Sequence, residues 1–165
     1  MGRIAFILAL AALQAVFGAP QWLLPDGAPY IVRALSYSFF HGSWWHLAIN
    51  AIAIWTVFDP KRMRRPMAEL PLAFLIAVVV YPLSFRPVIG FSNVLYAILG
   101  MRTPSLSSPW WKHPSVLVFL AVTVVLAFIP RFSATTHIAA FLLGMGIAAF
   151  RRFRNNLLRD AGRYL

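Results

Sequence analysis

The segment 87–101 is apolar, lies between two arginines and is too short to cross a membrane by itself. Even if fully helical it would reach about 22 Å at 1.5 Å per residue, whereas the hydrocarbon layer is roughly 30 Å thick. Pro87 and Gly90 disfavour helix ahead of Ser92, so we expect a short helix that begins near Ser92. Irregular backbone is tolerated at membrane depth only inside protein or beside a wet cavity. The segment therefore predicts a bundle in which Ser92 caps a short helix and faces a cavity.

The composition agrees with an integral membrane protein. Hydrophobic residues make up 61% of the 165 residues and charged residues 12%, and no cysteine is present for disulfide or thiol chemistry. The net charge of +11 comes mainly from short loops at the ends of apolar runs, which is typical of topology signals and of contact with anionic headgroups. Basic and aromatic residues are not interleaved in a soluble segment. We therefore expect the lipid bilayer, and not nucleic acid, as a partner.

The apolar runs predict six spans in a single all-α domain, residues 1–165. The spans are 4–24, 44–58, 67–85, 92–101, 114–130 and 136–150. The first run begins like a signal peptide, with a conceivable cleavage site at 15–19, but it continues to Leu24 and is long enough to be a retained helix. Residues 25–43 are aromatic and too apolar for a solvated loop, so we expect them to lie at the membrane interface.

The basic residues predict that both termini are cytoplasmic. An even number of spans places the two termini on one side, and in that topology most of the 15 Lys and Arg residues lie inside, as the positive-inside rule requires. The inside residues are Arg3, Lys61, Arg62, Arg64, Arg65, Arg102, Lys112, Arg151, Arg152, Arg154, Arg159 and Arg163; Arg33, Arg86 and Arg131 lie outside.

Five polar residues are predicted to reach one depth in the outer half of the bundle from three helices. They are His41, His46, Asn50, Ser92 and His137. His46 and Asn50 are four residues apart and share a helix face. Polar side chains inside a span are costly unless they face the protein interior, so each is a functional candidate. The alternative interpretation is interhelical hydrogen bonding, worth about 0.6 kcal/mol on average in membranes.

Together these residues fit nucleophilic catalysis. They supply a hydroxyl, an imidazole to take its proton, and an amide and second imidazole able to donate to an oxyanion. A Ser-His-Asp triad is disfavoured because three carboxylates are predicted on the cytoplasmic side and the fourth in an outer loop (Asp59, Glu69 and Asp160; Asp26). The rival is zinc held by His41, His46 and His137, but the chain has neither a His-Glu-x-x-His motif nor a nearby carboxylate base, so we expect no metal.

Three segments resemble the sequence signatures of the rhomboid intramembrane proteases. Residues 33–50 resemble the first-loop and second-helix signature, including its His-x-x-x-Asn at His46 and Asn50. Residues 90–100, with Gly90, Ser92, Tyr96, Ala97 and Gly100, resemble the Gly-x-Ser-Gly-x-x-Tyr-Ala-x-x-Gly segment. Residues 137–144 resemble the last-helix pattern of a histidine followed by small residues. The resemblance covers roughly residues 30–150.

The resemblance implies a compact six-helix bundle of the bacterial plasma membrane and a role for each matching residue. Ser92 would be the nucleophile and His137 the general base and later acid. His46 and Asn50 would form the oxyanion hole with the backbone N–H of Ser92. Tyr96 would pack against His137, and Gly90, Arg33 and His41 would support the site. The implied substrate is a transmembrane or membrane-proximal segment of a membrane protein, and no cofactor is implied.

Two departures from the family pattern bear on activity. Asn93 stands where the family usually has glycine after the serine, and its bulk is expected to crowd the oxyanion hole or reshape helix packing. Ala139 and Ala140 stand where glycine is common, which should loosen the contact between the fourth and sixth helices slightly. The alternative function is a proteolytically inactive rhomboid-like protein that binds membrane helices of client proteins.

Overall fold

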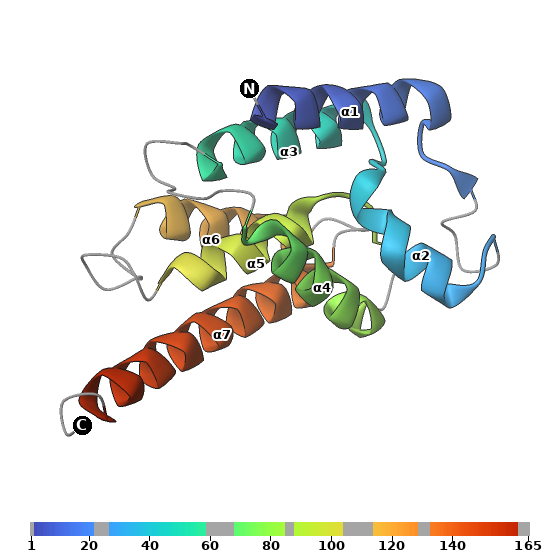
Figure 1. The fold of residues 1–165 in the computed structure, drawn as a ribbon. Helices are drawn as coiled ribbons and strands as arrows, with labels where there is room; N and C mark the ends of the chain where they lie inside the picture. Colours follow the sequence, from blue (N-terminus) through green and yellow to red (C-terminus); the bar gives the residue numbers. More distant parts are fainter. Residues whose placement is uncertain are drawn as a thin grey trace.

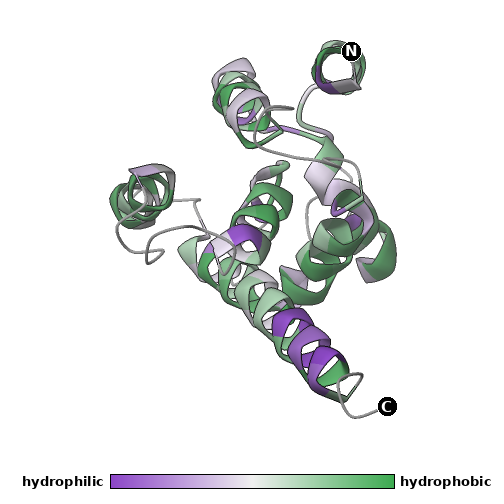
Figure 2. Ribbon diagram, turned by 60° about the vertical axis from the view of Figure 1, so that its left-hand side comes forward, coloured by the Kyte–Doolittle hydropathy of each residue, from purple (hydrophilic) through white to green (hydrophobic). Residues whose placement is uncertain are grey.

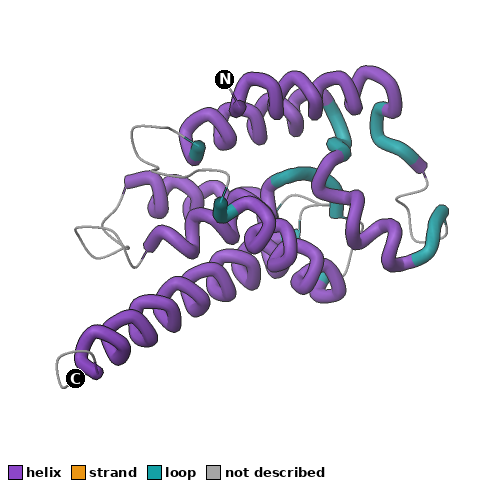
Figure 3. The backbone as a smooth tube through the Cα atoms, viewed as in Figure 1, coloured by secondary structure: helices purple, strands orange, loops and turns teal. Residues whose placement is uncertain are grey.

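The computed structural model describes residues 2–21, 27–58, 68–84, 88–103, 114–128 and 133–161. Every regular element in these ranges is a helix, and none is a strand (Figure 3). The predicted all-α class is therefore confirmed. The elements in chain order are α1 (Gly2–Phe17), α2 (Tyr30–Ser36), the 3₁₀ helix η2 (Tyr37–Phe39), α3 (Trp44–Val57), α4 (Leu70–Val80), the 3₁₀ helix η3 (Tyr81–Leu83), α5 (Ser92–Arg102), α6 (Pro114–Ala127) and α7 (Ala134–Ala161).

Helix α1 ends earlier than the predicted span 4–24. Gly18 follows the helix with a φ of +60° and donates its N–H to the carbonyl of Gln14 at 2.9 Å. A left-handed glycine of this kind closes the last turn, and Pro20 prevents the helix from resuming at once. The prediction that the helix continues through residue 21 is therefore wrong, and residues 22–24 lie outside the described ranges.

Helix α7 ends later than the predicted span 136–150. It continues to Ala161 as an exposed helix, which reaches past the other helices (Figure 1) and is hydrophilic near its end (Figure 2). Its 28 residues correspond to about 42 Å. Hydropathy marks the apolar part of a helix, whereas the helix itself ends where its backbone hydrogen bonds end.

Among the described helices, α7 alone is long and apolar enough to cross a membrane on length and composition. The shorter apolar helices are Gly2–Phe17, Trp44–Val57, Leu70–Leu83 and Val116–Val125. Their outward faces are apolar, with large side chains such as Leu8, Ile52 and Val125 exposed. Exposed apolar surface on several helices is what contact with lipid requires. The count of six spans remains a prediction.

Helix α5 is the centre of the molecule, and its residues 93–101 are all buried. Two glycines allow it to approach α7 closely. A Cβ added at Gly100 would lie 2.0 Å from the backbone oxygen of Phe141, and one added at Gly144 would lie 2.2 Å from that of Ala97. Small residues at a helix crossing let the two backbones touch, which is how helices pack when no hydrophobic force drives them together. The crossing determines how the N-terminal ends of α5 and α7 meet.

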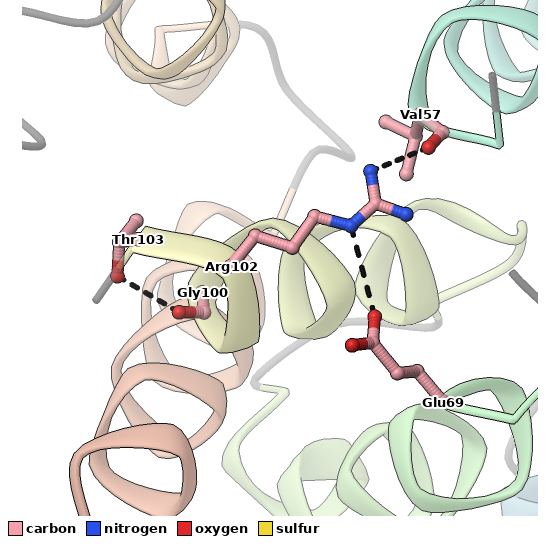
Figure 4. A network of polar contacts seen from close by, with 5 residues as sticks. All are labelled: Val57, Glu69, Gly100, Arg102 and Thr103. Carbon is pink, nitrogen blue, oxygen red and sulfur yellow. Dashed lines mark hydrogen bonds and ion pairs between the residues drawn. The ribbon is translucent and has the colours of Figure 1, made fainter. Parts of the chain in front are cut away.

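The C-terminal end of α5 is tied to two other helices by Arg102. Its guanidinium donates to the carbonyl of Val57 at the end of α3, and its Nε lies 3.6 Å from a carboxylate oxygen of Glu69 beside the start of α4 (Figure 4). The Thr103 hydroxyl closes the same helix end by donating to the carbonyl of Gly100 at 2.8 Å. Ser92 stands at the opposite end of α5, so this end anchors the helix away from the site.

Candidate active site

Ser92 is the first residue of α5, and its hydroxyl does not cap the helix. Phe91 occupies the N-cap position with helical backbone angles and makes no side-chain cap hydrogen bond. The prediction that Ser92 caps the helix is therefore wrong. Its Oγ lies 2.6 Å from Nε2 of His137 on α7. A hydroxyl that gives up the local capping bond for a histidine in another helix fits a chemical role better than a structural one.

The orientation of the His137 ring is determined by a backbone carbonyl. Nδ1 lies 2.6 Å from the carbonyl oxygen of Ser133, four residues earlier. A carbonyl oxygen only accepts, so Nδ1 carries the hydrogen. In the neutral ring Nε2 is then an acceptor and receives the hydrogen bond of the Ser92 hydroxyl. This tautomer is the one that a general base for the serine needs.

Tyr96 packs against His137 and is held by α6. The two rings make an edge contact with centroids 4.8 Å apart and planes at 70°. The Tyr96 hydroxyl donates to the carbonyl of Phe119 at 3.0 Å and hydrogen-bonds to the hydroxyl of Thr123. Sequence reasoning missed Thr123, although it is a lone hydroxyl residue within an apolar stretch of the predicted fifth span.

His46 and Asn50 lie against the backbone of Gly90, two residues before Ser92. A Cβ added at Gly90 would lie 2.6 Å from Cε1 of His46 and 3.4 Å from Nδ2 of Asn50. Gly90 has a φ of +118°, a conformation that other residues rarely adopt. The side-chain amide of Asn50 donates to the backbone carbonyl of His46 at 3.1 Å. This bond holds the Asn50 side chain against the preceding turn of α3. The predicted oxyanion residues therefore meet the segment that leads into Ser92.

His41 is fully buried behind His46, with ring centroids 5.2 Å apart. Neither of its ring nitrogens has a hydrogen-bond partner among the described residues. Burial, assisted by the nearby His46, lowers the pKa of His41 to about 3, so the ring is neutral at pH 7. Within the described ranges no three His, Asp or Glu side chains converge as metal ligands would.

Asn93 is fully buried and turned toward η2. Its amide Nδ2 donates to the hydroxyl of Tyr37 at 2.9 Å, and that hydroxyl donates to the carbonyl of Ala77 on α4 at 2.8 Å. The structure therefore ties Asn93 to the residues before α3. Sequence reasoning missed Tyr37, and its place among several aromatic residues carried no signal that singled it out.

Serine and histidine thus form a hydrogen-bonded pair between two closely packed helices of an all-α, largely apolar molecule. A family model described as the Rhomboid domain matches residues 28–153, which is more than half of the chain. The chain belongs to the rhomboid family, whose members are integral membrane proteins and in general intramembrane serine proteases. A search of curated proteins found no match to the chain.

Proposed function

We propose that this protein is an intramembrane serine endopeptidase that cleaves transmembrane or membrane-proximal segments of membrane proteins. The observation that carries the proposal is the 2.6 Å contact between the Ser92 hydroxyl and Nε2 of His137, with the ring tautomer set by the Ser133 carbonyl. Membership of the rhomboid family supports the same chemistry. In a Ser-His-Asp triad an aspartate orients the histidine ring, and here the Ser133 carbonyl has that role, so the proposed mechanism needs only Ser92 and His137.

In the proposed reaction Ser92 Oγ attacks the scissile carbonyl carbon while His137 Nε2 takes the hydroxyl proton. Collapse of the tetrahedral intermediate releases the amine, which receives that proton, and leaves an acyl-serine. Water then attacks the acyl carbon while His137 Nε2 takes its proton, and the bond from that carbon to Ser92 Oγ breaks as His137 returns the proton to Oγ, which releases the acid product. His137 returns to its starting state in each half of the cycle.

The developing oxyanion is stabilised in this proposal by His46, Asn50 and the backbone N–H of Ser92. The N–H groups of a first helical turn have no carbonyl one turn back, so they are available to an anion. The contact of His46 and Asn50 with Gly90 supports their assignment. Preorganised donors of this kind contribute about 10²–10³-fold to kcat each.

The membrane arrangement that goes with this function is six spans with both termini cytoplasmic in a bacterial inner membrane. The short helices α1, α3, α4 and α6 have exposed apolar faces, and the basic residues of α7 follow its apolar part. Both observations favour this topology.

The inactive client-binding protein is the alternative function, and Asn93 was the feature in its favour. In the structure the Asn93 amide hydrogen-bonds to Tyr37 on η2, whereas His46 and Asn50 contact Gly90. This weakens the argument that Asn93 obstructs the oxyanion residues.

The decisive experiment is cleavage of a helical transmembrane reporter by the purified protein in liposomes, with fluorophosphonate labelling in parallel. Cleavage and labelling should both be lost in Ser92→Ala, and Ser84→Ala is the matched control because its hydroxyl bonds locally to the Tyr81 carbonyl. His137→Ala should abolish cleavage while retaining the fold. A folded parent protein that neither cleaves nor labels would favour the client-binding alternative.

A further inference from the structure

Tyr37 contacts the chain on both sides of Ser92. Its backbone carbonyl accepts the N–H of Gly90 at 2.9 Å, and its hydroxyl accepts the amide hydrogen of Asn93 at 2.9 Å. Tyr37 and Asn93 are both completely inaccessible to solvent. One residue of η2 therefore holds the residue two positions before the serine and the residue directly after it.

The hydroxyl bond of Tyr37 has a fixed direction. The Tyr37 hydroxyl has one hydrogen, and it goes to the carbonyl of Ala77, which can only accept. Its oxygen must then accept from Asn93, so the amide nitrogen faces Tyr37. Burial raises the pKa of Tyr37 to about 12, which keeps this hydrogen in place at neutral pH.

Ala77 accepts from Tyr37 because its own helix has changed type. At the end of α4 the N–H of Tyr81 donates to Val78, three residues earlier, rather than to Ala77. Pro82 follows and has no N–H to donate. The switch to the 3₁₀ helix η3 leaves the Ala77 carbonyl available, so the chain Asn93–Tyr37–Ala77 connects α5, η2 and α4.

We propose that Tyr37 and Asn93 are positioning residues that hold the Ser92 hydroxyl in line with His137. The inference rests on the proposed protease function. Ser92 has no cap bond that would orient it locally, and Gly90 before it is a flexible residue that can adopt many backbone conformations besides its φ of +118°. Bonds from Tyr37 of η2 to the Gly90 N–H and to the Asn93 amide hold the chain at two points, one on each side of Ser92. The Asn93 side chain makes a hydrogen bond to Tyr37 that a glycine at this position could not make.

The test compares Asn93→Ala, Tyr37→Phe and the double variant with the parent protein. Active sites are titrated with a fluorophosphonate, and kcat is expressed per titrated site. We expect each single variant to lower kcat by about 10-fold with KM within 2-fold, because misplacement of a nucleophile acts on the chemical step. The second-order rate of Ser92 labelling should fall in parallel. The double variant should be no slower than the slower single variant, since Tyr37→Phe already removes the one bond that Asn93→Ala removes.

Tyr81→Phe is the matched control. The Tyr81 ring lies 4.8 Å from that of Tyr37, and the change likewise removes the phenolic hydroxyl of a buried tyrosine. No hydrogen bond from that hydroxyl is found within the described residues, so kcat per titrated site should stay at the parent value. If Tyr37→Phe does not fold, Asn93→Ala provides the same readout because it leaves the bond from Tyr37 to Ala77 intact.

The outcomes separate this inference from the proposed function. In one outcome Asn93→Ala has fewer active sites but the same kcat and labelling rate per titrated site as the parent. That result would show a merely structural role for Asn93, and it would overturn the inference while the protease function stands. If the parent protein is labelled at Ser92 but does not cleave the reporter, the second-order labelling rates of parent and variants are compared instead. Equal rates would overturn the inference. If the folded parent does neither, the inference falls together with the proposed function.

Discussion

Two single residues near the site, His41 and Gly90, have surroundings that predict measurable effects of substitution. His41 is the simplest case, because it is buried as a neutral ring with no hydrogen-bond partner among the described residues. Gly90 is another, because its left-handed backbone and its contact with His46 exclude any side chain.

We expect His41→Gln to weaken the dependence of stability on pH. The pKa of His41 is about 3 in the folded protein and about 6.5 in an ordinary environment, so the unfolded chain takes up a proton first as the pH falls. The stability from His41 is therefore present above about pH 6.5 and is lost between there and pH 3, at roughly 1.4 kcal/mol per unit. Thermal unfolding in detergent at pH 7.5 and 5.0 measures this. An equal fall in parent and variant would contradict it.

We expect Gly90→Ala to abolish labelling of Ser92. The new methyl group would lie 2.6 Å from the His46 ring, and the φ of +118° would be strained by about 1–3 kcal/mol. Gly42→Ala is the control, because a Cβ there meets nothing within 4 Å. Normal labelling of Gly90→Ala would mean that the His46 position is not needed.

At the level of whole helices, the crossing of α5 and α7 carries the active site. Gly100 and Gly144 bring the two backbones into contact, and the same crossing places Ser92 beside His137. Ser92 and His137 are far apart in sequence but each lies near the N-terminal end of its helix. A change at the crossing should therefore alter stability and activity together.

We expect Gly144→Ala to destabilise the protein by about 1–3 kcal/mol, the usual cost of overpacking. Its Cβ would lie 2.2 Å from the Ala97 carbonyl oxygen, so the helices must separate. Gly146→Ala, on the same helix with nothing within 4 Å, should be neutral or stabilising by up to ~1 kcal/mol from helix propensity. Thermal unfolding of both variants in one detergent provides the comparison, and equal midpoints would contradict the tight crossing.

At the level of the whole molecule, the proposed topology can be tested by cysteine labelling, because the chain contains no cysteine of its own. Single cysteines introduced at Tyr30 and at Arg154 should differ in their reaction with a membrane-impermeant maleimide. Both positions are exposed in the structure. Tyr30→Cys should label in intact cells, and Arg154→Cys should label only after the membrane is permeabilised. Labelling of both in intact cells would contradict a cytoplasmic C-terminus.

Hydropathy and helix breakers act over a few residues, and for this reason the sequence alone predicted the all-α class and the start of α3 and α5 within a residue. The resemblance of three segments also predicted the rhomboid family, now confirmed by the family model. Helix ends that depend on backbone hydrogen bonds, such as Phe17 and Ala161, were misplaced because hydropathy does not report them.

Tertiary structure decided between the alternative partners that the polar groups of the site could have had. Ser92 could have capped its own helix, and only the crossing of α5 with α7 offers its hydroxyl a histidine instead. The bond from Asn93 to Tyr37 joins residues 56 positions apart, and no local pattern pairs the two. Partners at such separation depend on how helices pack, and packing is set by the contacts of the whole chain.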